Sequence, residues 1–213
     1  MSVAELEKRR LSVLLDIRQP QAYLALHPAA ALAEECGIEV NWLPLVVPPL
    51  LAPSEPRSDD DRGVKHRRHR ARAIAREIAT YAAVQGLVIR DYYRDADPAE
   101  LDLAWLWVRE AYPERLFPFL AEAFRAYWAR ELEISSVDAV ASLVDRCGAG
   151  EREFQSWRAG VGPRKAAALA EELQGIGVAR APCYLVEDEV FVGRQHLAMI
   201  RWILAGRQGP GPI

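Results

Sequence analysis

The stretch Leu11–Leu24, LSVLLDIRQPQAYL, changes abruptly from the pattern of a strand to that of a helix. Leu11–Ile17 is a short and mainly aliphatic run, which is typical of a strand buried in a sheet. Pro20 has a fixed φ and no amide hydrogen, which suits a first helical turn, so we predict a helix over Pro20–Cys36. A second proline, Pro28, lies inside that span, where it would kink or interrupt the helix.

A second strand is predicted directly after this helix. Gly37 ends the helix, because glycine is common just past a helix C-terminus. Ile38–Leu45, IEVNWLPL, then has the apolar and β-branched composition of a strand. The order strand, helix, strand predicts a parallel βαβ unit with a right-handed crossover. A proline-rich and then acidic loop, Pro48–Gly63, follows this unit.

From Val64 onward the apolar residues are spaced as in helices for about a hundred residues. The predicted helices are Val64–Gln85, Pro98–Ala111, Pro113–Leu132, Ser136–Asp145, Gly150–Ala159 and Pro163–Leu173. The tryptophans, tyrosines and phenylalanines of this block recur at helical spacing, which is more typical of a core than of a substrate cleft.

The pattern returns to strands after Gly177. We predict a hairpin of Cys183–Val186 and Val190–Val192, followed by an amphipathic helix over Leu197–Leu204. The order βαβ, helical block, ββα predicts an α/β, thioredoxin-like fold interrupted by a long all-helical insertion. Residues 11–50 and 175–206 would form the discontinuous thioredoxin-like domain, and residues 64–174 the helical insertion domain.

Composition excludes several classes of protein. The net charge is -3, with 51% hydrophobic and 27% charged residues, an ordinary globular balance without a bias toward nucleic acid or anionic membranes. No apolar run approaches the roughly 20 residues that span a bilayer. The apolar run after the charged N-terminus meets Asp16 too soon for a signal peptide. We therefore expect a cytoplasmic protein with a small-molecule substrate and without a nucleic-acid or membrane partner. The sequence is compatible with a homodimer but does not decide the oligomeric state.

The three cysteines, Cys36, Cys147 and Cys183, form no C-x-x-C pair. This sparse, odd count argues against a disulfide framework and against a cysteine zinc site, and it favours free thiols in a reducing compartment. Cys183 could be reactive if a helix N-terminus lowered the pKa of its thiol, but a small apolar strand residue facing the core is the better interpretation.

Three separated motifs resemble one known family. DIRQPQAYL (16–24) resembles the D-x-x-S-P-Y-S/A-Y/W-L opening of the 2-hydroxychromene-2-carboxylate isomerases and kappa-class glutathione transferases, within the DsbA-like group. GVARAPCY (177–184) is similar to that family's G-V-x-G-V-P-T-F, and FVGRQHL (191–197) to its F-x-G-x-D-R-L. The motifs occur in the family's order, and the resemblance covers about Leu11 to Leu204.

The resemblance implies a glutathione-dependent isomerase or transferase with a small, aromatic or electrophilic substrate. In such enzymes glutathione lies along a cis-proline loop, here Ala181–Pro182, with its thiol beside the serine at the start of the first helix. A helix N-terminus favours a thiolate, which can add to an electrophilic carbon and leave again. The resemblance thus implies that Ala181–Pro182 is cis and packs against Gln19 and Pro20.

The site residues carried over are Gln19, Pro20, Ala181, Pro182, Gln195 and His196, with Gln19 as the candidate catalytic residue. Here Gln19 replaces the motif serine, Gln195 the aspartate and His196 the arginine. Gln195 lacks the charge that would bind glutathione's ammonium, a bond worth roughly 1.5–3 kcal/mol, so binding would weaken by about 10- to 100-fold. The alternative is a catalytically silent thioredoxin-fold binding protein. A dithiol oxidoreductase ranks last, because the first helix begins without a thiol.

The basic stretch Lys65–Arg72, KHRRHRAR, has two interpretations. It could contact phosphates, but a solvated helix face balanced by nearby acids fits the negative net charge better. In the resembled family a lysine early in this helix helps to form the ligand site, and Arg70 lies near that position. His66 and His69 have helical metal-ligand spacing without a third ligand, so no metal site is expected.

Overall fold

A computed structural model describes residues 10–57 and 61–212 of the protein. The charged N-terminal stretch and part of the acidic loop, Asp59 and Asp60 included, lie outside the described residues. Four strands form one sheet in the order β2-β1-β3-β4: β1 (Ser12–Leu15), β2 (Asn41–Pro44), β3 (Cys183–Val186) and β4 (Glu189–Val192). β1 pairs parallel with β2, as the βαβ unit predicts, and β3 pairs antiparallel with both β1 and β4.

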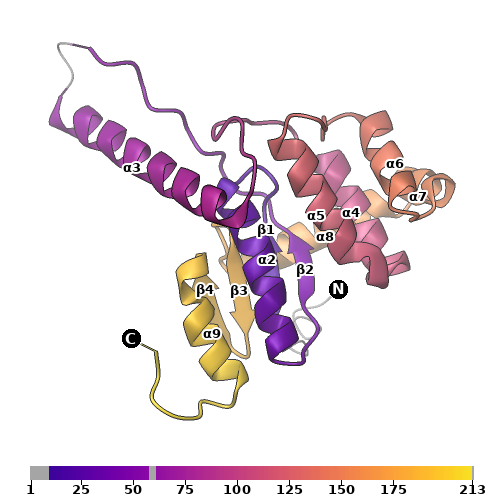
Figure 1. The fold of residues 1–213 in the computed structure, drawn as a ribbon. Coiled ribbons are helices and arrows are strands. Elements are labelled where there is room, and N and C mark those ends of the chain that lie inside the picture. The colour runs from indigo at the N-terminus through magenta and orange to yellow at the C-terminus, as the bar shows by residue number, and fades with distance from the viewer. Residues whose placement is uncertain (1–9, 58–60, 213) are drawn as a thin grey trace.

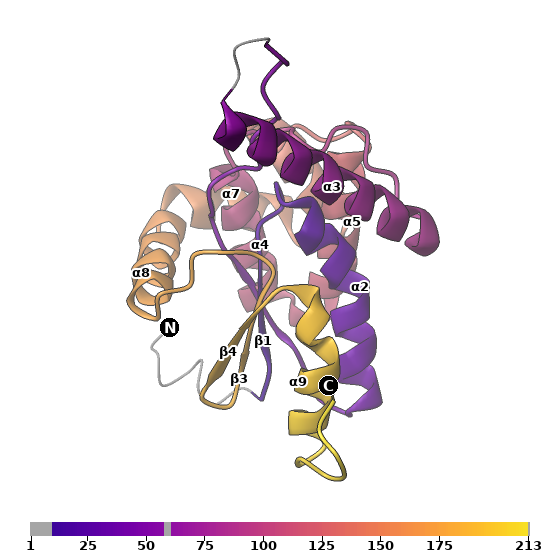
Figure 2. The same ribbon diagram turned by 90° about the vertical axis from the view of Figure 1, so that its left-hand side faces the viewer.

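Helices cover both faces of this sheet (Figure 2). α2 (Pro20–Glu35) and α9 (Leu197–Leu204) lie on one face, over Val13, Leu15 and Tyr184. α8 (Gly162–Gly175) lies on the other face and packs with Leu14 and Cys183. Because successive strand residues point to opposite faces and helices cover both, β1 is wholly buried and is apolar except for Ser12.

The insertion is all-helical. Besides α8 it consists of α3 (Arg62–Gln85), α4 (Ala99–Ala111), the 3₁₀ turn η1 (Pro113–Arg115), α5 (Leu116–Trp128), α6 (Val137–Arg146) and α7 (Glu151–Ala159). α4 is its centre and contacts β2, α5, α6, α7 and α8. The N-terminal part of α3 extends away from the rest of the molecule, whereas its C-terminal part packs against α2 (Figure 1). No helix of the described residues is both long and apolar enough to cross a bilayer.

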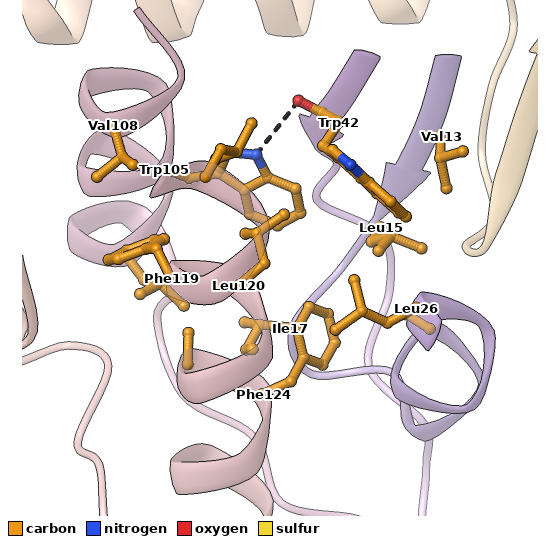
Figure 3. Packing of buried hydrophobic residues seen from close by; sticks show 14 of the residues in the cluster. Val13, Leu15, Ile17, Leu26, Trp42, Trp105, Val108, Phe119, Leu120 and Phe124 are labelled. Carbon is orange, nitrogen blue, oxygen red and sulfur yellow. Dashed lines mark hydrogen bonds between the residues drawn. The ribbon is translucent and has the colours of Figure 1, made fainter. Parts of the chain in front are cut away.

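The aromatic residues of the insertion are mainly core, as predicted. Trp105, Phe119, Phe124, Tyr127 and Trp128 are fully buried. The Trp105 indole donates a hydrogen bond of 3.3 Å to the carbonyl of Trp42 on β2, which joins the insertion to the sheet (Figure 3). Replacing one such buried aromatic residue by alanine typically costs about 3–5 kcal/mol, so this cluster is a main source of stability.

Several predicted element boundaries differ from the observed ones: β2 begins at Asn41 and not at Ile38, β1 is shorter than Leu11–Ile17, and α3 begins at Arg62 and not at Val64. Two further differences have identifiable reasons. The helix predicted over Pro113–Leu132 ends at Trp128, because Arg130 takes a positive φ of 63° and the Glu131 amide donates back to the carbonyl of Ala126. β4 begins at Glu189, one residue earlier than predicted, since Glu187 adopts a positive φ of 52° and the hairpin turn shortens to two residues.

Candidate functional site

The residues carried over from the resemblance meet at one edge of the sheet. β1 ends at Leu15 and leads into α2; β3 begins at Cys183, directly after Pro182; β4 ends at Val192, before Gly193. Since β1 and β4 run in the same direction and β3 runs against them, all three connections lie at the same edge. The Gly193 amide donates a hydrogen bond of 2.9 Å to the Pro182 carbonyl, and the Ala181–Pro182 peptide bond is cis.

Gln19 stands directly before α2 and is buried. Its main-chain carbonyl accepts from the amides of Ala22 and Tyr23, at 2.9 and 3.3 Å. Its side-chain amide turns away from the helix and donates a hydrogen bond of 2.9 Å to the carbonyl of Pro48. The side chain at the motif serine position therefore anchors the loop after β2.

A buried ion pair holds the turn between β1 and α2. The Asp16 carboxylate accepts hydrogen bonds from the Arg18 amide, Nε and Nη2 at 2.8–3.0 Å, and from the Val47 amide at 2.9 Å. The Arg18 guanidinium also donates to the Val47 carbonyl at 2.7 Å and to Asp95 at 3.1 Å. Arg18 and Asp95 were missed by sequence reasoning, because they are far apart in the chain and only the fold brings them together.

Gln195 and His196 belong to the 3₁₀ turn η2 (Arg194–His196), which packs against α2. The exposed Gln195 amide donates to the Val192 carbonyl at 3.0 Å, and the side chain folds over Gly193. The φ angle of Gly193 is 100°, and a Cβ at this position would lie 2.2 Å from Gln195 Oε1. The position therefore requires glycine. The His196 ring lies 5.5 Å from the ring of Phe191.

Helix α3 covers this turn. The Arg194 guanidinium lies 3.3 Å from the centre of the Tyr81 ring and forms an ion pair of 3.0 Å with Glu77. Arg70, the suggested ligand-site position, is exposed on α3, as are most residues of the basic stretch. Arg68 is the exception, because it is buried and donates to the carbonyls of Ser54 and Glu55.

Cys183 is fully buried in the cluster beneath α8, opposite Leu14 of the neighbouring strand β1. Burial raises the pKa of its thiol to about 11. A thiol with such a pKa stays protonated near neutral pH, and the thiolate is the reactive form. The interpretation of Cys183 as a core residue is therefore the one that the structure supports.

A cavity of about 700 Å³ adjoins the site on the side of α8. It lies between the β2 end with its following loop, the first half of α4, and α8, and Pro48 lines it while also accepting the hydrogen bond of Gln19. Asp102 lies in its wall, and burial together with the charge of Asp16 raises the pKa of this carboxyl well above its usual range. Sequence reasoning missed Asp102, although it shares one face of α4 with Ala99, Leu103 and Leu106, where a carboxyl is unusual.

Neither a protein-family model nor a curated protein sequence matches the chain. Solved structures do. A 2-hydroxychromene-2-carboxylate isomerase superposes with a TM-score of 0.68 at 15% identity, covering 92% of this chain and 94% of that one. A probable DsbA oxidoreductase from Streptomyces coelicolor superposes with a TM-score of 0.68 at 19% identity, covering 96% of this chain and 93% of that one. The cytosolic disulfide reductase DsbM from Pseudomonas aeruginosa, solved with GSH, superposes with a TM-score of 0.61 at 19% identity, covering 92% of this chain and 98% of that one.

The chain is thus an α/β protein with the thioredoxin-like fold interrupted by a long all-helical insertion. The fold is of the DsbA-like type, shared by the isomerase and the disulfide oxidoreductases, and the likeness extends over nearly the whole of each structure. Because one fold hosts several activities, the chemistry has to be argued from the site itself.

Proposed function

We propose that this protein is a divergent glutathione-dependent isomerase or transferase that acts on a small aromatic or electrophilic molecule. The observation that carries the proposal is the meeting of three segments at one sheet edge: the α2 start at Gln19 and Pro20, the Ala181–Pro182 turn, and the Gln195–His196 turn. These are the segments that the resemblance assigns to glutathione.

The chemistry of this edge favours a thiol brought by a ligand. The α2 start, Gln19-Pro20-Gln21-Ala22, has no cysteine, and the nearby Cys183 is a neutral core thiol. The N-terminal end of a helix carries a partial positive charge of about +0.5, which stabilises a ligand thiolate placed there. That thiolate can form a bond to an electrophilic substrate carbon; breaking it again gives isomerisation, and keeping it gives conjugation.

A catalytically silent binding protein is the second candidate. It is favoured by the occupation of both glutamine amides, since Gln19 donates to Pro48 and Gln195 donates to Val192. In either case we place the protein in the cytoplasm, where the glutathione pool is reduced.

Calorimetric titration with reduced glutathione, together with the ultraviolet absorbance of bound thiolate, tests the proposal. We expect binding with a dissociation constant in the micromolar to millimolar range and a thiolate signal; S-methylglutathione, which has no thiol, is the matched control without that signal. Absence of binding by both compounds at millimolar concentration would overturn the enzyme proposal in favour of the silent candidate. Insulin reduction that survives Cys183→Ser would contradict both candidates.

A further inference from the structure

The N-terminal part of α3 concentrates positive charge. Residues 61–76 contain seven lysine and arginine residues and a single acidic residue, Asp61. The chain as a whole has a net charge of -3, so the rest of the molecule is net negative. The expectation of a protein without a nucleic-acid partner depended on this overall charge, and the overall charge conceals how unevenly the charges are distributed.

Five basic residues lie along one side of α3. They are spaced alternately by three and four residues, which places their side chains on the same face of a helix: Arg62, Lys65, His69, Arg72 and Arg76. All five are exposed. At a rise of about 1.5 Å per residue this row, the cationic stripe, is about 21 Å long.

The acidic side chains near the cationic stripe have other partners. The Asp61 carboxylate accepts a hydrogen bond of 2.8 Å from the Val64 amide and so caps α3. Glu77 forms its ion pair of 3.0 Å with Arg194 of η2. Across residues 10–57 and 61–212, no ion pair involves a residue of the stripe. The described acids therefore do not balance the stripe.

This arrangement of charges costs α3 stability. Like charges three or four residues apart repel one another on a helix surface, as Arg72 and Arg76 do here. Tertiary packing compensates little of this repulsion, because the buried residues of α3 are Arg68, which contacts the preceding loop, and Ile78 and Ala82 beyond the stripe. An anionic partner would relieve the repulsion that the described fold leaves uncompensated.

The side chains around the cationic stripe discriminate between kinds of anionic partner. A helix that lies on a membrane needs large apolar side chains beside its cations, and the centre of a protein interface is usually apolar or aromatic. The large apolar residues within 61–76 are Val64 and Ile74, and both are partly buried. A phosphate backbone requires charge and hydrogen-bond donors without an apolar face, and lysine and arginine supply them.

α3 also has the dimensions of a helix that fits a DNA groove. A helix with its side chains is about 10–12 Å in diameter, and the major groove of duplex DNA is about 12 Å wide. Because the N-terminal part of α3 projects from the rest of the molecule (Figure 1), it can approach a duplex while the net negative remainder stays at a distance.

We propose that the cationic stripe of α3 binds the phosphate backbone of duplex DNA, independently of the base sequence. The inference does not rest on the proposed function, because the stripe contains none of the residues assigned to glutathione.

Fluorescence anisotropy of a labelled DNA duplex of about 20 base pairs, titrated with the full chain, tests the proposal. We expect a dissociation constant of about 1–100 μM near physiological salt. Affinity should fall roughly 100-fold from about 50 to 200 mM salt, as about four phosphate contacts imply. Combining Arg62→Gln, Lys65→Gln, Arg72→Gln and Arg76→Gln should weaken binding at least about 10-fold and remove most of the salt dependence.

The matched control combines Arg90→Gln, Arg146→Gln, Arg152→Gln and Arg164→Gln, which removes four exposed cations outside α3. It changes the net charge equally and should keep the affinity within about threefold. An equal loss in both variants, or no measurable binding at about 50 mM salt, would overturn the proposal. Preferential displacement of the duplex by phosphatidylserine vesicles or by poly-glutamate would assign the stripe to a membrane or to an acidic protein instead.

Amide hydrogen exchange of the full chain locates the contact. Adding the duplex should slow exchange in residues 62–76, because binding suppresses local opening of this part of α3. Unchanged exchange there, with duplex bound, would show that the DNA contacts another surface and would refute the assignment to the cationic stripe.

Discussion

The side chain of Gln85 donates a hydrogen bond of 3.1 Å to the carbonyl of Leu24, the group that Pro28 leaves without its helical partner. Proline has no amide hydrogen, so the carbonyl four residues earlier in the helix is unpaired. Here α3 supplies the missing donor to α2 from outside. α2 consequently runs from Pro20 to Glu35 without the interruption that Pro28 suggests in the sequence.

Gln85→Leu should lower the free energy of unfolding by about 1–3 kcal/mol, because it leaves the Leu24 carbonyl partly buried and unpaired. Urea denaturation of the variant measures the loss. Pro28→Ala restores an amide at the position that normally pairs with Leu24. The loss caused by Gln85→Leu should therefore shrink in the Pro28→Ala background, and equal losses in both backgrounds would contradict this account.

Asp16→Asn should lower the free energy of unfolding by about 3–5 kcal/mol, since it removes one partner of a buried, hydrogen-bonded ion pair with Arg18. Asp95→Asn is the matched control: it removes the half-exposed partner of the same guanidinium and should cost less than about 1 kcal/mol. Chemical denaturation compares the two. Similar losses for both variants would show that the turn before α2 does not depend on the buried pair.

Cys183 should resist alkylation by iodoacetamide at pH 8 in the folded protein, because burial raises the pKa of its thiol to about 11. Cys36, which is partly exposed, is the internal comparison and should react first. Mass spectrometry of the digested protein identifies the modified thiol. Faster modification of Cys183 than of Cys36 without denaturant would be incompatible with its place in the core.

Asp102→Asn should raise the free energy of unfolding at pH 7 and leave it nearly unchanged at pH 3. The folded state holds the pKa of Asp102 above its unfolded value, so the protonated form is favoured on folding. Stability is therefore lost as pH rises above the unfolded value of about 3.9 toward the folded one. Denaturation at both pH values tests the sign, with Asp188→Asn, an exposed carboxylate in the turn between β3 and β4, as control. Stabilisation at pH 3 of the same size as at pH 7 would refute it.

Gln195→Asp should tighten glutathione binding by about 10-fold if the proposed site is used, because a carboxylate can form a charge-assisted bond with the ligand's ammonium. Gln208→Asp adds the same charge in the C-terminal tail and should leave the affinity unchanged. Calorimetry on both variants gives the comparison. An equal gain in both would attribute the effect to net charge alone.

Sequence alone determined the order of the elements and the edge at which the three motifs meet. Both follow from local information: the spacing of apolar residues, prolines and glycines at the ends of helices, and the direction that each strand must take. The N-cap of α6 is a local signal of the same kind: the Ser136 hydroxyl accepts a hydrogen bond from the Ala139 amide. The resemblance of the three motifs to one known family then predicted the fold that the solved structures share.

Only the tertiary structure decided which partner each polar side chain finds. Gln19 donates a hydrogen bond to Pro48, Gln85 completes the hydrogen bonding of α2, and Asp102 lies in the wall of an apolar cavity, where burial raises the pKa of its carboxyl. These outcomes depend on residues distant in the chain, because a hydrogen bond or a desolvated carboxyl is set by what surrounds it in three dimensions. The periodicity of a sequence records which face of an element is buried, but not what that face is buried against.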